Sequence, residues 1–174
     1  MSWHARKGSA AVDVVIGAAI IIFVVLPMFS VVIERFILIN KAQIVKDALD
    51  MTNMAVYDSI IAGRLGKTSV DFEPGVVRQV FRELLSENLK LDADMEPLPD
   101  SIADGRVGIE SIEIYTADLP QKCSEGTVLS RPSVHSCVSI PVRPTLYRRI
   151  ISGILGRDHI NMRVHMDSEI PLDR

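Results

Sequence analysis

An uncharged apolar segment near the N-terminus limits what this 174-residue chain can fold into. It covers residues 14–33, and those 20 residues include no Asp, Glu, Lys or Arg. As an α-helix such a segment is about 30 Å long, which matches the hydrocarbon core of a bilayer. The segment therefore predicts a membrane-spanning helix, and the rest of the chain is interpreted as what that helix carries.

The residues around this segment favour a retained anchor over a secretory signal that is removed. A secretory signal has an apolar run of about 7 to 15 residues, followed by a cleavage site made of small residues. Here the run is longer, and Glu34, Arg35 and Phe36 follow it. Arg6 and Lys7 precede it, which predicts a single-pass protein of the inner (cell) membrane with a cytoplasmic N-terminus and an extracytoplasmic C-terminal domain.

Asp13 comes directly before the apolar run. An acid inside a membrane helix is costly and by default indicates a functional position. At the first turn of its helix it would also stabilise the positive end of the helix dipole, so a purely local role stays open. If the chain were cut between Gly8 and Ser9, the new amine would lie four residues before Asp13. The two charges could then pair on one helix face or between neighbouring subunits.

Residues 7–13, Lys-Gly-Ser-Ala-Ala-Val-Asp, followed by the apolar run, resemble the class III signal of type IV pilins and pseudopilins. In that family a prepilin peptidase cuts after the glycine, on the cytoplasmic side of the membrane. The apolar helix then serves as membrane anchor and as the packing core of a filament. The chain also resembles the TadE-like pseudopilins of tight-adherence (Flp) pilus systems, which have a short basic leader, one long N-terminal helix and a small extracytoplasmic domain.

The resemblance implies leader cleavage between Gly8 and Ser9, and pairing between subunits through Asp13. It also implies four kinds of partner: membrane lipid, other pilin-like subunits, a pilus assembly platform and the peptidase. The family acid is usually glutamate, major Flp pilins carry tyrosine where Val14 stands, and they are much shorter. A minor pilin-like component is therefore expected. The alternative is an uncleaved signal-anchored envelope protein whose outer domain binds a ligand or a cell-wall component.

The long helix is expected to continue beyond the membrane. After residue 33, apolar residues recur at helical spacing opposite a polar face, as in an amphipathic helix. We expect a leader over residues 1–8, one helix over about 9–61, and an outer domain over 62–174. Pro27 lies inside the apolar run and removes a backbone hydrogen bond, so a helix kink is expected near it.

In the outer domain, apolar residues first recur at helical spacing and then alternate with polar residues, as in strands. Residues 74–91 predict a second helix and residues 92–106 a loop. Strands are expected over 107–115, 134–142 and 160–167, with a short helix over 145–155 packed against the sheet. The predicted fold class is α+β, a long N-terminal helix carrying a small antiparallel sheet with one or two extra helices.

The chain carries two cysteines, Cys123 and Cys137, both in the outer domain. An even count in an extracytoplasmic setting favours a disulfide between them, with two free thiols as the alternative. His135 lies close to Cys137 in sequence, but this pair lacks the spacing typical of a zinc site, so neither a metal nor a cofactor is expected.

Enzyme signatures are absent from the sequence. It contains no G-x-S-x-G elbow, no phosphate-binding glycine loop and no H-E-x-x-H motif, so no catalytic residue is assigned. The net charge is −3 and the positive charges are dispersed, which argues against a nucleic-acid partner. The predicted function is therefore structural.

Overall fold

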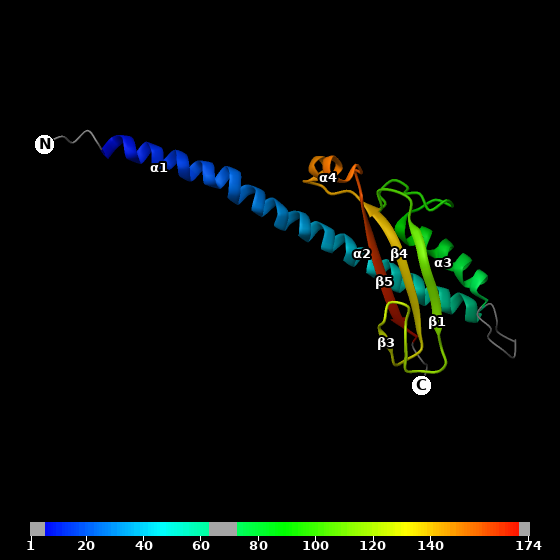
Figure 1. The fold of residues 1–174 in the computed structure, drawn as a ribbon. Coiled ribbons are helices and arrows are strands. Elements are labelled where there is room, and N and C mark those ends of the chain that lie inside the picture. Colours follow the sequence, from blue (N-terminus) through cyan, green and yellow to red (C-terminus); the bar gives the residue numbers. More distant parts are fainter. Residues whose placement is uncertain (1–5, 63–72, 171–174) are drawn as a thin grey trace.

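The computed structural model describes the backbone of residues 6–62 and 73–170, and within them the side chains of 6–10, 60–62, 150, 151 and 155 lie outside the description. One helical run fills the N-terminal part in three consecutive pieces: α1 (Arg6–Ile20), the π-helical segment η1 (Ile21–Val25) and α2 (Leu26–Ala62). It projects as a long rod from a small α+β head (Figure 1). The expected combination of a long N-terminal helix and a small antiparallel sheet is confirmed.

The π-helical segment lies just before Pro27. Proline has no N–H, and its ring collides with the carbonyl group four residues earlier in a regular α-helix. The turn before Pro27 widens accordingly, because the Leu26 N–H bonds to the Ile21 carbonyl oxygen, five residues back. A π-helical turn therefore precedes Pro27, and the kink expected there stays a prediction.

The head is built on the second half of α2. After it, α3 (Pro74–Leu89) turns back and packs against α2. A three-stranded antiparallel sheet follows, in the order β1 (Gly108–Tyr115), β4 (Ser133–Val142), β5 (Ile160–Glu169). Between β1 and β4 the chain forms a small hairpin of β2 (Gln121–Lys122) and β3 (Val128–Leu129), which the sequence did not predict. Figure 1 shows the sheet lying across α2.

One face of the sheet forms the hydrophobic core with the two helices. Side chains of α2, α3 and β4 fill it, and Leu49, Phe81 and Ile140 are fully buried there. On β4 the alternating residues Val138, Ile140 and Val142 belong to this core, and on β5 Met162 and Val164 pack in it. We call this the inner face of the sheet, and the opposite face the outer face.

A buried amide ties α2 to the sheet. Asn53 is fully buried, and its Nδ2 donates to the Val134 carbonyl oxygen at 3.3 Å and to the Ser168 hydroxyl at 3.0 Å. These contacts reach β4 and β5 from a single side chain on the helix. Because a buried polar group is costly unless it is hydrogen-bonded, they fix how the helix and the sheet are aligned.

The short helix after β4 differs from the prediction in its packing. It is α4 (Arg148–Leu155), and it lies at the end of the sheet where β4 ends and β5 begins, rather than on a face of the sheet (Figure 1). Leu146 and Ile154, which were expected against the sheet, are 50% and 76% exposed. The reason is the loop before α4, which bonds to α2 near the point where the helix leaves the head.

Candidate functional site

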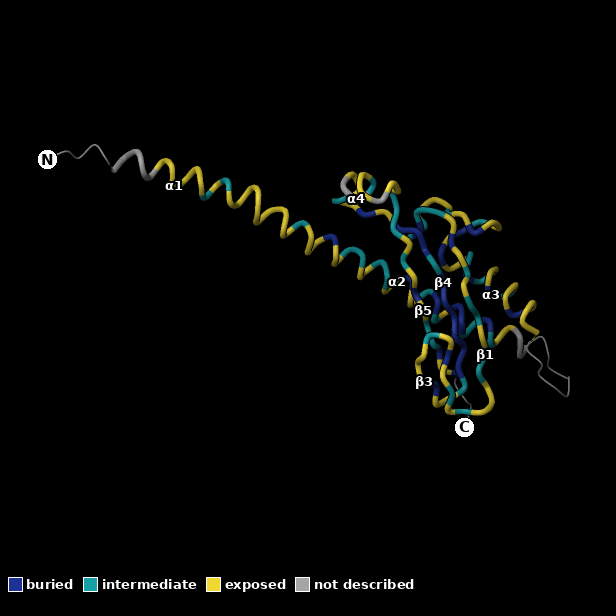
Figure 2. Tube along the Cα trace, viewed as in Figure 1, coloured by how far each residue is buried: buried dark blue, intermediate teal, exposed yellow. Residues whose placement is uncertain are grey.

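The first half of the helical run presents an exposed apolar surface. Figure 2 shows that most of the N-terminal part of the helical run is exposed. Large apolar side chains are exposed at most positions from 12 to 39, and Phe23, Phe29 and Phe36 are each more than 60% exposed. We call this the apolar helix surface. A contiguous exposed patch of this kind indicates contact with lipid or with another protein. Within the described residues, one helix, Ala11–Ser59, is long and apolar enough to cross a membrane, which is compatible with a single-pass anchor.

Asp13 lies at the N-terminal end of this surface. It is exposed, and the described side chains offer it no hydrogen-bond or ion-pair partner. The other two positions of the predicted processing site, Gly8 and Ser9, belong to α1, but their side chains lie outside the described part. The cleavage prediction therefore stays a prediction.

Glu34 joins the apolar helix surface to the head. Its carboxylate is buried, and its two oxygens accept the backbone N–H groups of Thr145 at 2.9 Å and Leu146 at 2.6 Å. The Tyr147 hydroxyl donates to the Pro27 carbonyl oxygen at 2.8 Å. Charge-assisted bonds of this type are stronger than neutral ones, so the loop before α4 is held firmly against the helix.

An open apolar groove of about 490 Å³ lies beside this junction. It is formed mainly by α2, with one side chain from the loop before α4; its lining residues are Val31, Glu34, Arg35, Leu38, Ile39, Ala42 and Tyr147. The groove continues the apolar helix surface toward the head. A partner helix packed along α2 would therefore meet apolar side chains up to this point.

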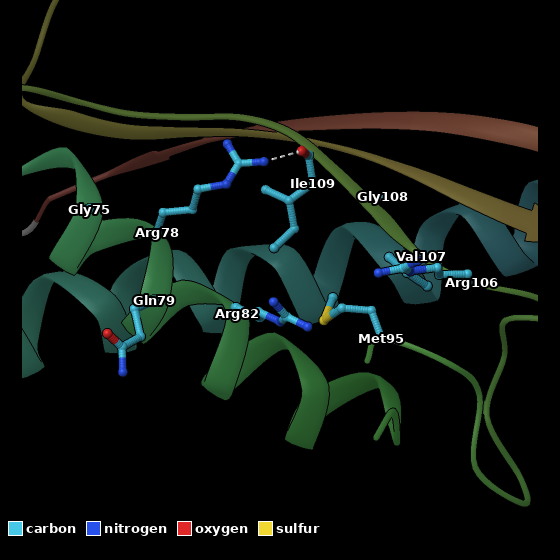
Figure 3. Close-up of a pocket in the computed structure, with 9 residues that line it drawn as sticks. All are labelled: Gly75, Arg78, Gln79, Arg82, Met95, Arg106, Val107, Gly108 and Ile109. Carbon is cyan, nitrogen blue, oxygen red and sulfur yellow. Dashed lines mark hydrogen bonds between the residues drawn. The ribbon is translucent and has the colours of Figure 1, made fainter. Parts of the chain in front are cut away.

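A second hollow in the head is cationic. It has a volume of about 450 Å³, and three arginines line it, Arg78 and Arg82 from α3 and Arg106 from the loop before β1 (Figure 3). Arg78 Nη2 donates to the Ile109 carbonyl oxygen at 2.7 Å, and Arg82 donates to the Ala93 carbonyl oxygen. Neither of these acceptors is a carboxylate, and within the described residues no ion pair engages any of the three. The hollow therefore suits an anion.

The outer face of the sheet carries a cluster of a thiol, an imidazole and a carboxylate. Cys123 follows β2, His135 lies on β4 and Asp167 on β5. His135 Nδ1 is 2.6 Å from Asp167 Oδ1, and Cys123 Sγ is 3.9 Å from Asp167 Oδ2. The three ligand atoms all lie within 4.8 Å of one another, and Cys123 and His135 are buried. These are donor atoms that a metal ion could share.

Ser124 contacts the far side of the same imidazole. Its hydroxyl oxygen is 3.0 Å from His135 Nε2. Serine, histidine and aspartate are thus connected in the order used by acyl-transfer enzymes, although the sequence carries no such motif. Chemically, the arrangement can either relay a proton or hold a metal ion with the serine orienting the ring.

Arg163 holds the hairpin over this face. Its guanidinium bonds to Glu110 and to both carboxylate oxygens of Glu125, which follows Ser124 in the turn between β2 and β3. Its bonds to Arg163 keep the pKa of Glu125 below its ordinary value. Nearby, burial and the bond to Glu113 raise the pKa of Tyr115 to about 12, so this phenol stays neutral.

The two cysteines are free thiols in the structure, and the disulfide favoured by the sequence stays a prediction. Each thiol faces a different carboxylate. Cys123 Sγ lies near Asp167, whereas Cys137 Sγ is 3.6 Å from Glu110 Oε2. Burial raises the pKa of Cys137 to about 11, which keeps it protonated at neutral pH.

Sequence reasoning missed the cluster because it paired His135 with its neighbour in the chain, Cys137. In the structure the partners of His135 come from a hairpin and from the last strand, both distant in sequence. The one signal that could have found them is the polar alternation of β4 and β5. It places His135 opposite Asp167 once the strands are paired in the correct register.

Comparisons with known proteins give no relative for this chain: no family model matches it, and neither a curated protein nor a solved structure is similar to it.

Proposed function

We propose that the chain is a minor pilin-like (pseudopilin) structural component of a type IV or Tad-type pilus or secretion apparatus. It would be anchored in the inner membrane by a single pass, with its head outside. One observation carries the proposal. The helical run from Arg6 to Ala62 exposes apolar side chains along its first half and forms a layer of the head's core with its second half. A subunit that packs laterally through its helix while presenting a folded head needs both properties.

In the proposed mechanism, leader removal after Gly8 creates an amine on Ser9, and Asp13 pairs with the amine of a neighbouring subunit. Asp13 supports this role because it is exposed at the end of an apolar surface, with no ionic partner among the described residues. A membrane acid without a partner is unfavourable, so pairing between subunits would favour association. The apolar groove beside Glu34 would extend the contact toward the head.

N-terminal sequencing of the protein isolated from its own membranes tests the processing step. Ser9 as the first residue is expected, and an intact Met1 would contradict the proposal. Asp13→Asn should then reduce incorporation into the assembled filament or apparatus, whereas Asp13→Glu should retain it, because only the first change removes the charge. Equal incorporation of the two variants would contradict the pairing role even if the leader is removed.

A second candidate function is favoured by the cationic hollow. An uncleaved, signal-anchored protein could use Arg78, Arg82 and Arg106 to bind an anionic ligand of the cell envelope. Guanidinium groups bind phosphate and carboxylate groups with two parallel hydrogen bonds, which suits such a site. An intact N-terminus together with inorganic phosphate binding that is lost in Arg82→Gln would favour this candidate over the first.

A further inference from the structure

We propose that Cys123, His135 and Asp167 form a binding site for a divalent transition-metal ion of the zinc class on the outer face of the sheet. The three side chains supply a thiolate, an imidazole and a carboxylate, the donor atoms that zinc takes from proteins. They come from the hairpin, β4 and β5, and their ligand atoms lie within 4.8 Å of one another. The site does not depend on membrane anchoring or on leader cleavage.

The separations of the ligand atoms suit a tetrahedral ion after small side-chain rotations. With metal–ligand bonds of about 2.0 to 2.3 Å, a tetrahedral site needs ligand atoms about 3.3 to 3.6 Å apart. Cys123 Sγ and Asp167 Oδ2 are 3.9 Å apart, and His135 Nδ1 and Asp167 Oδ1 are 2.6 Å apart. The first pair has to close slightly and the second has to open slightly, and the three ligand atoms, which lie within 4.8 Å of one another, have to converge on the ion.

Ser124 supports coordination through Nδ1 of His135. Metal-bound histidines usually donate their other N–H group to an oxygen, which fixes the ring. The Ser124 hydroxyl is 3.0 Å from Nε2, on the side of the ring away from Asp167. On binding, the ion takes the place of the proton at Nδ1, the single proton of the neutral imidazole is then on Nε2 and is donated to Ser124, and the Cys123 thiol releases its proton to solvent.

The charges around the cluster favour a cation. Three further carboxylates lie on this face, those of Glu110 and Glu113 from β1 and Glu125 from the hairpin turn. Arg163 is a permanent cation on this face, and its charge is engaged by Glu110 and Glu125. A divalent ion would offset the excess negative charge. The Asp167 side chain is 15% exposed, which gives an entering ion a route from solvent.

Metal binding accounts for the cluster better than acyl transfer does. The connected serine, histidine and aspartate would suffice for acyl transfer, but that function would not use the Cys123 thiol. Metal binding uses all three converging side chains and gives Ser124 the orienting role described above. It also explains why a buried thiol faces a carboxylate, a contact that at 3.9 Å is a weak hydrogen bond at best.

The test uses the full chain, purified in detergent with an affinity tag that contains no histidine. Titration with ZnCl₂ should show one ion bound per chain and a rise in melting temperature. CoCl₂ should give the charge-transfer absorption of a thiolate–cobalt bond, a readout that needs no substitution. Absence of saturable binding at one ion per chain, or a cobalt complex without the thiolate band, would overturn the proposal.

Cys123→Ser and Cys137→Ser form a matched pair, because both replace a buried thiol by a hydroxyl on the same face of the sheet. Cys123→Ser should lose the cobalt thiolate band and at least about tenfold in zinc affinity, since it removes a ligand. Cys137→Ser should keep both. Loss of the band in Cys137→Ser with its retention in Cys123→Ser would overturn the assignment. Asp167→Asn, which keeps an oxygen opposite His135 but removes the charge, should also weaken zinc binding.

Discussion

Tyr147 donates a hydrogen bond to the carbonyl oxygen of Pro27 across 2.8 Å, joining the loop before α4 to the helix far from it in sequence. The contact lies just past the π-helical segment, on a stretch that the proposed function puts inside the membrane. It positions α4 where head and lipid would meet. With the Glu34 carboxylate, it makes the loop before α4 part of the junction between helix and head.

Tyr147→Phe removes this bond and keeps the ring. We expect the free energy of unfolding to fall by about 0.5 to 1.5 kcal/mol, the usual net value of one hydrogen bond. Denaturant unfolding in detergent measures the loss, and hydrogen exchange should place it at α4. Tyr115→Phe is the control, because that hydroxyl bonds Glu113 on the sheet and should leave exchange at α4 unchanged. Unaltered exchange at α4 in Tyr147→Phe would contradict the expectation.

Glu34→Ala should have a larger effect than Tyr147→Phe. It leaves the amide groups of Thr145 and Leu146 without their acceptor, and an unsatisfied buried donor costs about 1 to 3 kcal/mol. Glu34→Gln keeps one acceptor oxygen, so its free energy of unfolding should fall less than that of Glu34→Ala. The measurement is amide exchange at residues 145 and 146, expected to rise in the order wild type, Gln, Ala. Equal exchange in the three proteins would show that the carboxylate does not hold the loop.

Asn53→Ala should loosen α2 from the sheet. The change deletes the donor to Val134 and Ser168 and opens a small cavity, for an expected loss of about 1 to 3 kcal/mol in the free energy of unfolding. Met51→Ala, on the exposed side of the same helix, should stay within about 0.5 kcal/mol of wild type. The two values come from denaturant unfolding of the variants. Similar losses in both would contradict a specific role for the buried amide.

The junction should also weaken in acid through Asp158. The hydrogen bond from His159, and the charges of Arg143 and Arg148, keep the pKa of Asp158 below its ordinary value of 3.8. A lowered folded-state pKa stabilises the fold above the ordinary value, and this stabilisation is lost as pH falls through the folded-state value. Melting temperatures measured from about pH 6 to about pH 2 should therefore drop less steeply for Asp158→Asn. Asp94→Asn, an exposed acid in the loop after α3, is the control. Parallel profiles for wild type and Asp158→Asn would contradict the expectation.

The sequence was sufficient for the elements whose side chains follow a simple period. The long helix and the alternation of β4 could be predicted because apolar residues that become buried, such as Leu49 and Ile140, recur at a fixed spacing. The position of α4 could not be predicted from the sequence. Its apolar residues suit a sheet as well as a helix. The loop before α4 is instead positioned by the Glu34 carboxylate, which accepts backbone N–H groups of the loop, and by the Tyr147 hydroxyl, which donates to the Pro27 carbonyl oxygen.

The outer-face cluster escaped prediction for a related reason. The contact between His135 and Asp167 depends on strand register, and that between Cys123 and Asp167 depends on a hairpin whose strands are too short to give a period. Local spacing instead favoured a disulfide, which needs only two cysteines in the outer domain. The residues of this cluster are therefore brought together by pairing between distant strands, whereas the helices and strands themselves follow from local sequence patterns.

The unbroken course of α2 from its exposed portion into the head has a mechanical consequence. The sheet is hydrogen-bonded to α2, the same helix whose N-terminal part would lie in the lipid. The head is therefore expected to move together with this helix. Over the about 33 Å of helix between Glu34 and Val56, a change of about 10° in tilt would carry the far end of the head sideways by about 6 Å. In a helix that spans a bilayer as proposed, a force that tilts the helix would therefore displace the sheet.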